Sequence, residues 1–160
     1  MKRRCKVVVL TLVCCMLFGA IPVAAADERL GTVVDGSLLT DDTEVAYSVL
    51  PKARGTYLAS GSGGLSLSAY RKLYMYGDTT SYKTVDKIKV HLYLQRLENG
   101  SWVTVYNLGP KTAYNNYYVS AGQTYSVAGG HYYRVYGGHT IIHGSTTESQ
   151  TSYSNGFWVE

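Results

Sequence analysis

Histidines are the residues of this sequence whose type and spacing could bind a metal ion. His139 and His143 are four positions apart, a spacing that holds zinc when both side chains lie on one face of a helix. On a strand the same two residues are separated by about 13 Å, because a strand rises about 3.3 Å per residue. One ion cannot bridge that distance. We interpret these residues, together with His91 and His131, as sheet or loop histidines, and we expect no metal site and no cofactor.

Motifs of nucleophilic catalysis do not occur, since the sequence contains neither G-x-S-x-G nor S-x-x-K. Two carboxylates that hydrolyse a glycosidic bond would have to come from the few acidic residues after position 54. These residues are Asp78, Asp86, Glu98, Glu148 and Glu160. We therefore expect no enzyme and no catalytic residue, and a secreted hydrolase is the alternative.

Tyrosine is the most informative residue type, because the chain holds 16 tyrosines and only 2 phenylalanines. A tyrosine side chain supplies contact area and a polar tip at low entropic cost, as in antibody paratopes. Tyr93, Trp102 and Tyr106 are the candidate ligand-binding residues, as an aromatic surface for a glycan or a protein. The other interpretation is that tyrosine replaces Leu and Phe as a strand former and that Trp102 covers an edge of the fold. Both interpretations are open at this point.

Tyr93 lies in the clearest strand of the sequence. Apolar residues occupy every second position from Ile88 to Leu94, with polar or amphipathic residues between them, which is typical of a strand that covers a core. Asn99-Gly100 follows and favours a two-residue type I′ turn, because both central residues of that turn need a positive φ.

A two-residue turn at Asn99-Gly100 fixes the register of the hairpin, so that paired positions add to 199. The expected pairs are Leu97 with Trp102, Arg96 with Val103, Gln95 with Thr104, Leu94 with Val105, Tyr93 with Tyr106 and His91 with Leu108. This register predicts an outward stripe of Tyr93, Leu97, Trp102 and Tyr106. A slip of one residue would exchange the two faces.

Further segments have the composition of short strands and are separated by turn residues such as Gly77-Asp78 and Ala121-Gly122. The predicted strands are 56–60, 65–67, 72–76, 81–84, 117–120, 124–127, 131–136, 148–153 and 157–159. Strands at this spacing without a helix predict an all-β fold, a single antiparallel β-sandwich similar to fibronectin or immunoglobulin domains but free of cysteine. Tyr133-Arg134-Val135 predicts a tyrosine corner, in which the phenol bonds to the preceding loop and Val135 points inward.

The N-terminal segment has the three parts of a secretory signal. Four basic residues within positions 2–6 precede an apolar run from Val7 to Ile21, and Ala24-Ala25-Ala26 then provides a cleavage site. An uncleaved membrane anchor is the alternative, but a spanning helix needs about 20 apolar residues. We therefore predict a cleaved signal peptide over residues 1–26, an acidic flexible leader over 27–53 and a β-sandwich domain over 54–160.

Cleavage would change the meaning of the formal net charge of +4, which counts 15 basic and 11 acidic residues. Residues 1–26 hold four basic residues, no acidic residue and all three cysteines, so the remaining chain has 11 of each charge and a net charge of zero. A neutral chain has no basic stripe for nucleic acid and no polybasic segment for an anionic membrane. We expect neither partner, and no disulfide.

Several stretches of the sequence resemble a family of small secreted Firmicutes proteins, largely clostridial, that is catalogued as a domain of unknown function. The stretches are Val85–Val103 (VDKIKVHLYLQRLENGSWV), Gly129–Val135 (GGHYYRV), His139, Ser145–Ser149 (STTES) and Ser152–Gly156 (SYSNG). The resemblance covers about residues 53–160, together with the signal and acidic leader. It implies an exported Gram-positive protein, and because the family has no assigned activity it implies no site residues.

Taken together, the sequence predicts a secreted, extracellular, non-enzymatic module that binds a surface glycan or a protein through an aromatic face of its sheet. A structural or self-associating exoprotein is the alternative from another class. Zero net charge lowers the repulsion between copies, and strands at the edge of a sheet can pair between chains.

Overall fold

The computed structural model describes residues 29–42, 46–49 and 55–160, which consist of strands, turns and bends. No helix occurs in these residues, so the prediction of an all-β fold is confirmed. Membrane-spanning helices are accordingly not found in the described part of the chain. The predicted signal peptide, residues 1–26, lies outside the described residues.

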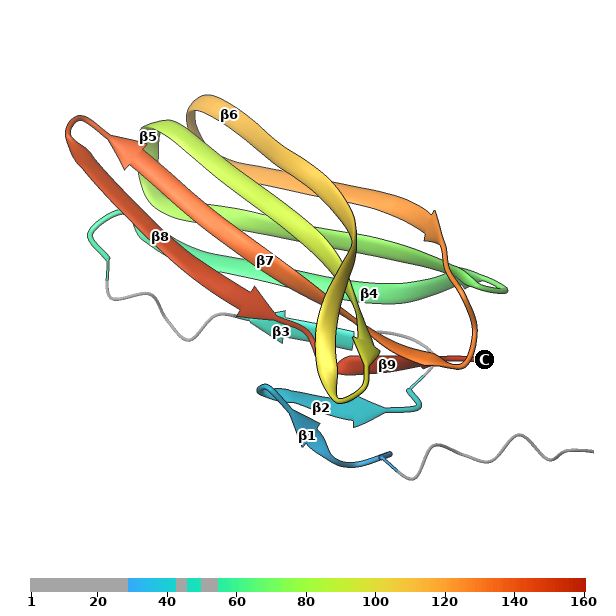
Figure 1. The fold of residues 1–160 in the computed structure, drawn as a ribbon. Helices are drawn as coiled ribbons and strands as arrows, with labels where there is room; N and C mark the ends of the chain where they lie inside the picture. Colours follow the sequence, from blue (N-terminus) through green and yellow to red (C-terminus); the bar gives the residue numbers. More distant parts are fainter. Residues whose placement is uncertain (1–28, 43–45, 50–54) are drawn as a thin grey trace, which may run out of the picture.

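Nine strands form one mixed sheet in the described part of the chain (Figure 1). They are β1 (Val33–Val34), β2 (Ser37–Thr40), β3 (Ala46–Val49), β4 (Leu58–Ala69), β5 (Lys72–Glu98), β6 (Ser101–Ser126), β7 (His131–His143), β8 (Thr146–Tyr153) and β9 (Gly156–Val159). The order is β1-β2-β9-β7-β5-β4-β3, with β6 beside β5 and β8 beside β7. The prediction of a purely antiparallel arrangement is wrong at one pair, because β2 and β9 are parallel.

Two long strands replace four of the short strands that the sequence predicts. β5 and β6 span 27 and 26 residues and pair as one hairpin, with Gly77 opposite Ala121. The sequence predicts a turn at Gly77, but in the structure a Cβ at this position would lie 2.5 Å from the carbonyl oxygen of Ser62 and 2.8 Å from the side chain of Leu92. The glycine therefore serves close packing within a strand.

The β5–β6 hairpin bends back over itself, as Figure 1 shows. The first part of β5 pairs with β4 and the end of β6, whereas its second part pairs with β7 and the start of β6. The register is irregular between Thr80 and Val85, where this change of partners occurs. The main core lies between the two halves and is formed by Leu58, Leu65, Leu73, Met75, Val85, Ile88, Val90, Leu92, Leu94, Val119, Tyr133, Val135, Ile141, Phe157 and Val159.

Part of the segment expected to be a flexible leader belongs to this sheet. β1 and β2 form a hairpin around Asp35-Gly36, and Leu39 pairs with Gly156 at the start of β9. Ser37 and Leu39 are almost completely buried. A second, smaller core lies under this hairpin and consists of Leu39, Leu97 and Tyr132, with Val34, Trp102 and Trp158 packed against them. Residues 27–28, 43–45 and 50–53 of the expected leader lie outside the described residues.

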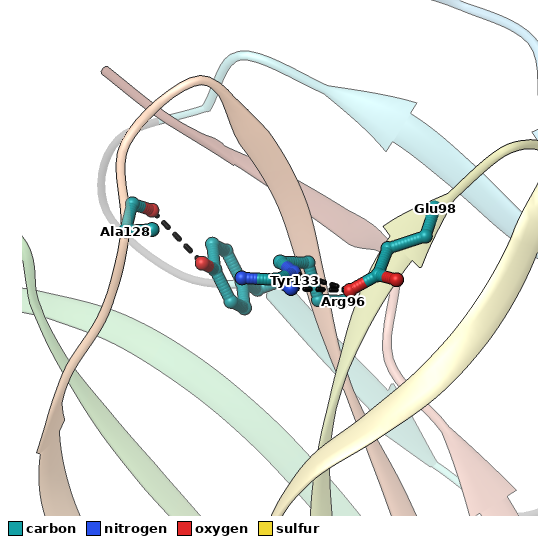
Figure 2. A network of polar contacts seen from close by, with 4 residues as sticks. All are labelled: Arg96, Glu98, Ala128 and Tyr133. Atoms are coloured by element: carbon teal, nitrogen blue, oxygen red, sulfur yellow. Dashed lines mark hydrogen bonds and ion pairs between the residues drawn. The ribbon is translucent and has the colours of Figure 1, made fainter.

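The predicted tyrosine corner is confirmed (Figure 2). The hydroxyl group of Tyr133 donates a hydrogen bond of 2.8 Å to the carbonyl oxygen of Ala128, and Val135 is completely buried. Next to this ring, Nε of Arg96 donates a hydrogen bond of 2.8 Å to the carboxylate of Glu98. The tyrosine corner therefore fixes the start of β7.

Candidate functional site

The register of the β5–β6 hairpin decides where the three candidate residues lie. Asn99 and Gly100 have φ angles of 48° and 81°, which confirms the type I′ turn, and Leu97 pairs with Trp102 as predicted. Beyond the pair of Gln95 and Thr104 the register shifts by one residue. The remaining predicted pairs, from Leu94 with Val105 to His91 with Leu108, are therefore wrong.

The shift places Tyr106 on the same face as the main core. Tyr106 lies opposite Leu94, whose side chain is fully buried in that core, and directly opposed residues of neighbouring strands point to one face. Its ring stacks on Tyr125 at 4.4 Å, and its hydroxyl group donates to the carbonyl oxygen of Ser126. The structure therefore does not bring Tyr106 together with Tyr93 and Trp102, and the predicted outward stripe does not form.

Trp102 lies on the outer face but is held under the β1–β2 hairpin. Its indole Nε1 donates a hydrogen bond of 3.1 Å to the carbonyl oxygen of Val34, and its ring packs against the small core. Leu97, which was expected to be exposed beside it, is only 3% exposed for the same reason. Part of the Trp102 ring surface is thus used to attach the N-terminal hairpin.

Tyr93 belongs to a row of aromatic rings that crosses three neighbouring strands on the outer face, the face opposite the main core. Tyr93 of β5 pairs with Tyr136 of β7, which pairs with Tyr153 of β8. The ring centroids are 5.5 Å and 5.3 Å apart, within the range of favourable aromatic pairs. His91 extends the row, with its ring stacked 4.2 Å from Tyr93. We call these four residues the aromatic row.

Hydrogen bonds hold the end of the aromatic row at His91. The side-chain oxygen of Asn107 accepts from the backbone N–H of Gly109, so it also accepts, rather than donates, in its 2.6 Å contact with His91 Nε2. Nε2 therefore carries the proton, and Nδ1 accepts from the hydroxyl group of Tyr93 at 3.0 Å. The Tyr93 hydroxyl oxygen keeps its lone pairs available to accept a hydrogen bond from a ligand.

Arg134 lies between the aromatic row and the β1–β2 hairpin and is 4% exposed. Its guanidinium carbon is 4.9 Å from the ring centre of Tyr153 and 4.5 Å from that of Trp102. The guanidinium donates to Gln95 Oε1, to Ser37 Oγ and to the carbonyl oxygen of Asp35. Burial lowers the pKa of Arg134, and Asp35 and Tyr153 oppose that change. Arg134 thereby joins the hairpin to the sheet and fixes one side of Tyr153.

A shallow groove of about 310 Å³ continues the outer face beyond the Tyr136–Tyr153 pair. Its floor holds the pairs Gly138–Thr151 and Thr140–Ser149, and the hydroxyl groups of Thr140 and Ser149 are 3.0 Å apart. The groove is open at Gly138, where a Cβ would meet nothing closer than 3.9 Å. Aromatic rings beside a hydroxyl-lined groove are a combination that binds polar, ring-shaped ligands.

His139, on the other side of β7, has a structural environment. Thr79 Oγ1 donates to the carbonyl oxygen of Lys89 and so accepts from His139 Nδ1 at 2.8 Å, while Nε2 accepts from Ser152 Oγ at 2.9 Å. His139 is 0% exposed. Burial lowers its pKa to about 4, although Asp78 acts in the opposite direction. It is therefore neutral at physiological pH and unavailable to a ligand.

His143 is separated from His139 along the strand, packs against Tyr57 at 4.9 Å and has its Nδ1 3.4 Å from the carboxylate of Asp86. Within the described ranges, no three His, Cys, Asp or Glu side chains come together as a metal-binding group. Glu148, one of the five possible acids, accepts hydrogen bonds from the backbone N–H groups of Thr56, Tyr57 and Leu58.

Tyr136 and Tyr153 were not found from the sequence, although a signal for them exists. His143 pairs with Thr146 across Gly144-Ser145, and Gly144 has a φ of 58°. A two-residue turn at this place makes paired positions add to 289, which puts Tyr136 opposite Tyr153. The position of Tyr93 beside Tyr136 depends on pairing between β5 and β7, which no local turn specifies.

The sequence of the chain matches the model of a protein family of unknown function, DUF6147, over residues 24–156. The chain belongs to this family. The DUF6147 match extends on both sides of the boundary predicted between residues 53 and 54, and it includes β1 to β8.

Two other comparisons accompany the DUF6147 match. Among solved structures, the crystal structure of Spo0M, sporulation control protein, from Bacillus subtilis is similar to 73% of this chain at 12% sequence identity and a TM-score of 0.34. The chain covers 49% of the Spo0M chain, about half its length. A TM-score of this size does not establish a shared fold. None of the curated proteins matches the chain.

Proposed function

We propose that this DUF6147 protein is an exported, non-enzymatic module that binds a surface glycan through the aromatic row and the adjoining groove. One observation carries the proposal. Rings from three neighbouring strands, Tyr93, Tyr136 and Tyr153, lie side by side on one face and end at a groove lined by hydroxyl groups.

Each part of this face supplies one requirement for sugar binding. The apolar face of a sugar ring packs against an aromatic ring, and the sugar hydroxyls need donors and acceptors placed at the rim. The Tyr93 oxygen, which accepts, and the hydroxyl groups of Thr140 and Ser149 supply these groups. All of them project from paired strands, which hold a site more rigidly than loops do.

The finer assignments of fold and location belong to the same proposal. The two halves of the β5–β6 hairpin face each other across the main core, which supports a β-sandwich of the fibronectin or immunoglobulin type. The basic and apolar pattern of residues 1–26 supports export, and the resemblance to secreted Firmicutes proteins supports a Gram-positive source. An exported protein of such a source meets cell-wall and surface glycans.

A glycan array probed with the purified chain tests the proposal. Tyr136→Ala and Tyr153→Ala remove the centre and the open end of the aromatic row, and we expect each to lower affinity at least about tenfold, or about 1.4 kcal/mol. Tyr117→Ala is the matched control, because Tyr117 is 58% exposed on β6 and is not part of the row. Circular dichroism should show all three variants folded.

Two results would contradict the glycan proposal. One is an array on which the unaltered chain retains no glycan while a pulldown from cell surfaces recovers a protein partner. The other is equal glycan affinity of the unaltered chain and both row variants. In either case the aromatic row would have a different role.

The long edge of β6 favours self-association as a second candidate function. In the described part of the chain, this strand of 26 residues pairs only with β5, so its other edge is open to another chain. Val103 and Tyr114 on β6 are 42% and 65% exposed. Sedimentation velocity without ligand distinguishes this function, because edge pairing makes the sedimentation coefficient rise with concentration.

A further inference from the structure

The outer face is positively charged next to the groove. Lys89 of β5 lies directly opposite Thr140, which lies opposite Ser149 in the floor of the groove. Lys87, two positions away on the same face, lies opposite Ile142. His91 lies opposite Gly138, at the open position of the groove. Two lysines of β5, the strand next to the groove, therefore lie on this face.

The carboxylates of the described strands have partners elsewhere. Asp78 accepts from Ser62 of β4, Asp86 accepts from the backbone N–H of Gly144, and Glu98 pairs with Arg96. Glu148 lies opposite Ile141 of the main core, so it points to the other face of β8.

The lysines beside the groove keep their charge available. Within the described residues, neither Lys87 nor Lys89 forms an ion pair. The Nζ of Lys87 lies 5.3 Å from the ring centre of Tyr114 on β6, on the side of β5 away from the groove, so Lys89 is the nearer charge. Lys89 is half-buried, which reduces the screening of its charge by water.

We propose that the ligand is an acidic glycan, whose negatively charged group lies in the groove beside Lys89 while a neighbouring sugar packs on the aromatic row. This inference rests on the proposed function and specifies its ligand class. The Tyr136–Tyr153 pair and the Thr140–Ser149 pair are four residues apart on β7, or about 13 Å along the strand. This distance suits a short oligosaccharide rather than a monosaccharide. Either a carboxylate or a phosphate could supply the negative charge of the glycan, and the test includes a probe of each kind.

Titration calorimetry with two forms of one sugar chain tests this inference. The probes are an oligogalacturonate and its fully methyl-esterified form, which has the same sugars without the charge, and a poly(glycerol phosphate) carrying sugar substituents provides the phosphate arm. We expect at least one acidic probe to bind about tenfold more tightly than the neutral ester at low salt. Because Lys89 remains partly in contact with solvent, salt still screens its charge and the preference should fall in 0.5 M NaCl.

Two variants test whether the preference for the acidic probe depends on the groove. Lys89→Gln should lower affinity for the acidic probe about three- to fivefold and leave affinity for the neutral ester unchanged. Lys72→Gln is the control, because Lys72 is exposed at the start of β5 and lies opposite Ser126, away from the groove. It should alter neither affinity.

The possible results separate this inference from the proposed function. Equal binding of all acidic and neutral probes would overturn the acidic ligand and leave glycan binding in place. A preference that Lys72→Gln reduces as much as Lys89→Gln would overturn the role of the groove, because the attraction would then be a general charge effect. Binding of no glycan on the array or in the calorimeter would overturn both proposals.

Discussion

Lowering the pH should destabilise this protein through His139 in a range where carboxylates contribute little. The imidazole is 0% exposed and neutral, with Thr79 and Ser152 as partners of its two nitrogens. Protonation would add an N–H at Nε2, the nitrogen that accepts the hydrogen bond from the Ser152 hydroxyl group, so that two donors would face each other in a fully buried site. The folded protein therefore resists taking up this proton.

The size of the effect follows from the pKa of His139, which burial lowers from 6.5 to about 4. The unfolded chain binds the proton near pH 6.5 and the folded chain only near pH 4. The stabilisation that neutral His139 gives the fold is therefore complete above pH 6.5 and is lost as the pH falls from 6.5 to about 4. A pKa difference of about 2.5 corresponds to about 3 kcal/mol, of which about 2 kcal/mol is lost between pH 7 and pH 4.5.

Urea unfolding at pH 7.0, 6.0, 5.0 and 4.5 measures this loss in the unaltered chain and in His139→Gln. The variant should be less stable at pH 7, because the glutamine amide does not fill the site of the imidazole ring. Between pH 7 and pH 4.5, however, the free energy of unfolding of the variant should fall by about 2 kcal/mol less than that of the unaltered chain. His131→Gln serves as the control for the loss of a histidine, since His131 is only half-buried.

Parallel curves for the unaltered chain and His139→Gln between pH 7 and pH 4.5 would refute the reasoning. Such curves would mean that the folded protein protonates His139 as easily as the unfolded chain does. The buried network of Thr79, His139 and Ser152 would then have to open without unfolding the sheet.

Three further predictions test the groove, the N-terminal hairpin and the contact between β4 and β8. Gly138→Val should keep the melting temperature within a few degrees and abolish glycan binding in the array, whereas Gly137→Val, whose Cβ would lie 2.6 Å from Ser152 Oγ, should unfold at clearly lower temperature. Trp102→Ala should lower the free energy of unfolding in urea by about 3 kcal/mol, because Trp102 packs on the small core; a loss of glycan affinity at unchanged stability would contradict this role. Burial tends to raise the pKa of Glu148, but hydrogen bonds from the backbone N–H groups of residues 56–58 outweigh it and lower the pKa. Glu148→Gln should therefore cost about 1 kcal/mol in urea unfolding at pH 7, and this cost should shrink as the pH falls and the native carboxyl group takes up its proton.

Features that depend on a few neighbouring residues could be predicted from the sequence. Asn99-Gly100 makes a type I′ turn because both residues tolerate a positive φ, and the alternation from Ile88 to Leu94 places four side chains in the core. The same kind of signal was present at Asp35-Gly36, with φ angles of 46° and 79°. Its flanking strands are too short to show a period, so the sequence alone predicts a leader there.

Features that depend on packing between distant segments could not be predicted in this way. Gly77 is typical of a turn, and only the folded chain, in which the carbonyl oxygen of Ser62 and the side chain of Leu92 lie against it, shows that glycine is needed there for space. Val105 looks like an ordinary strand residue, yet it is the extra residue that shifts the register and moves Tyr106 to the core face. The pattern of one segment contains no information about such a neighbour.

Along β7 the outer face changes from part of the small core, at the start of the strand, to the candidate binding surface further along it. Side chains two positions apart on β7 share this face, from Tyr132 through Arg134 and Tyr136 to Gly138. Tyr132 is buried in the small core under the β1–β2 hairpin, and Arg134 bonds to the turn of that hairpin. Tyr136 lies beyond Arg134 and is half-buried, and Gly138 opens the groove. Because the N-terminal hairpin covers only the first part of this series, a change that detaches it, such as Arg134→Ala, should expose Tyr132 and lengthen the aromatic surface while it destabilises the fold.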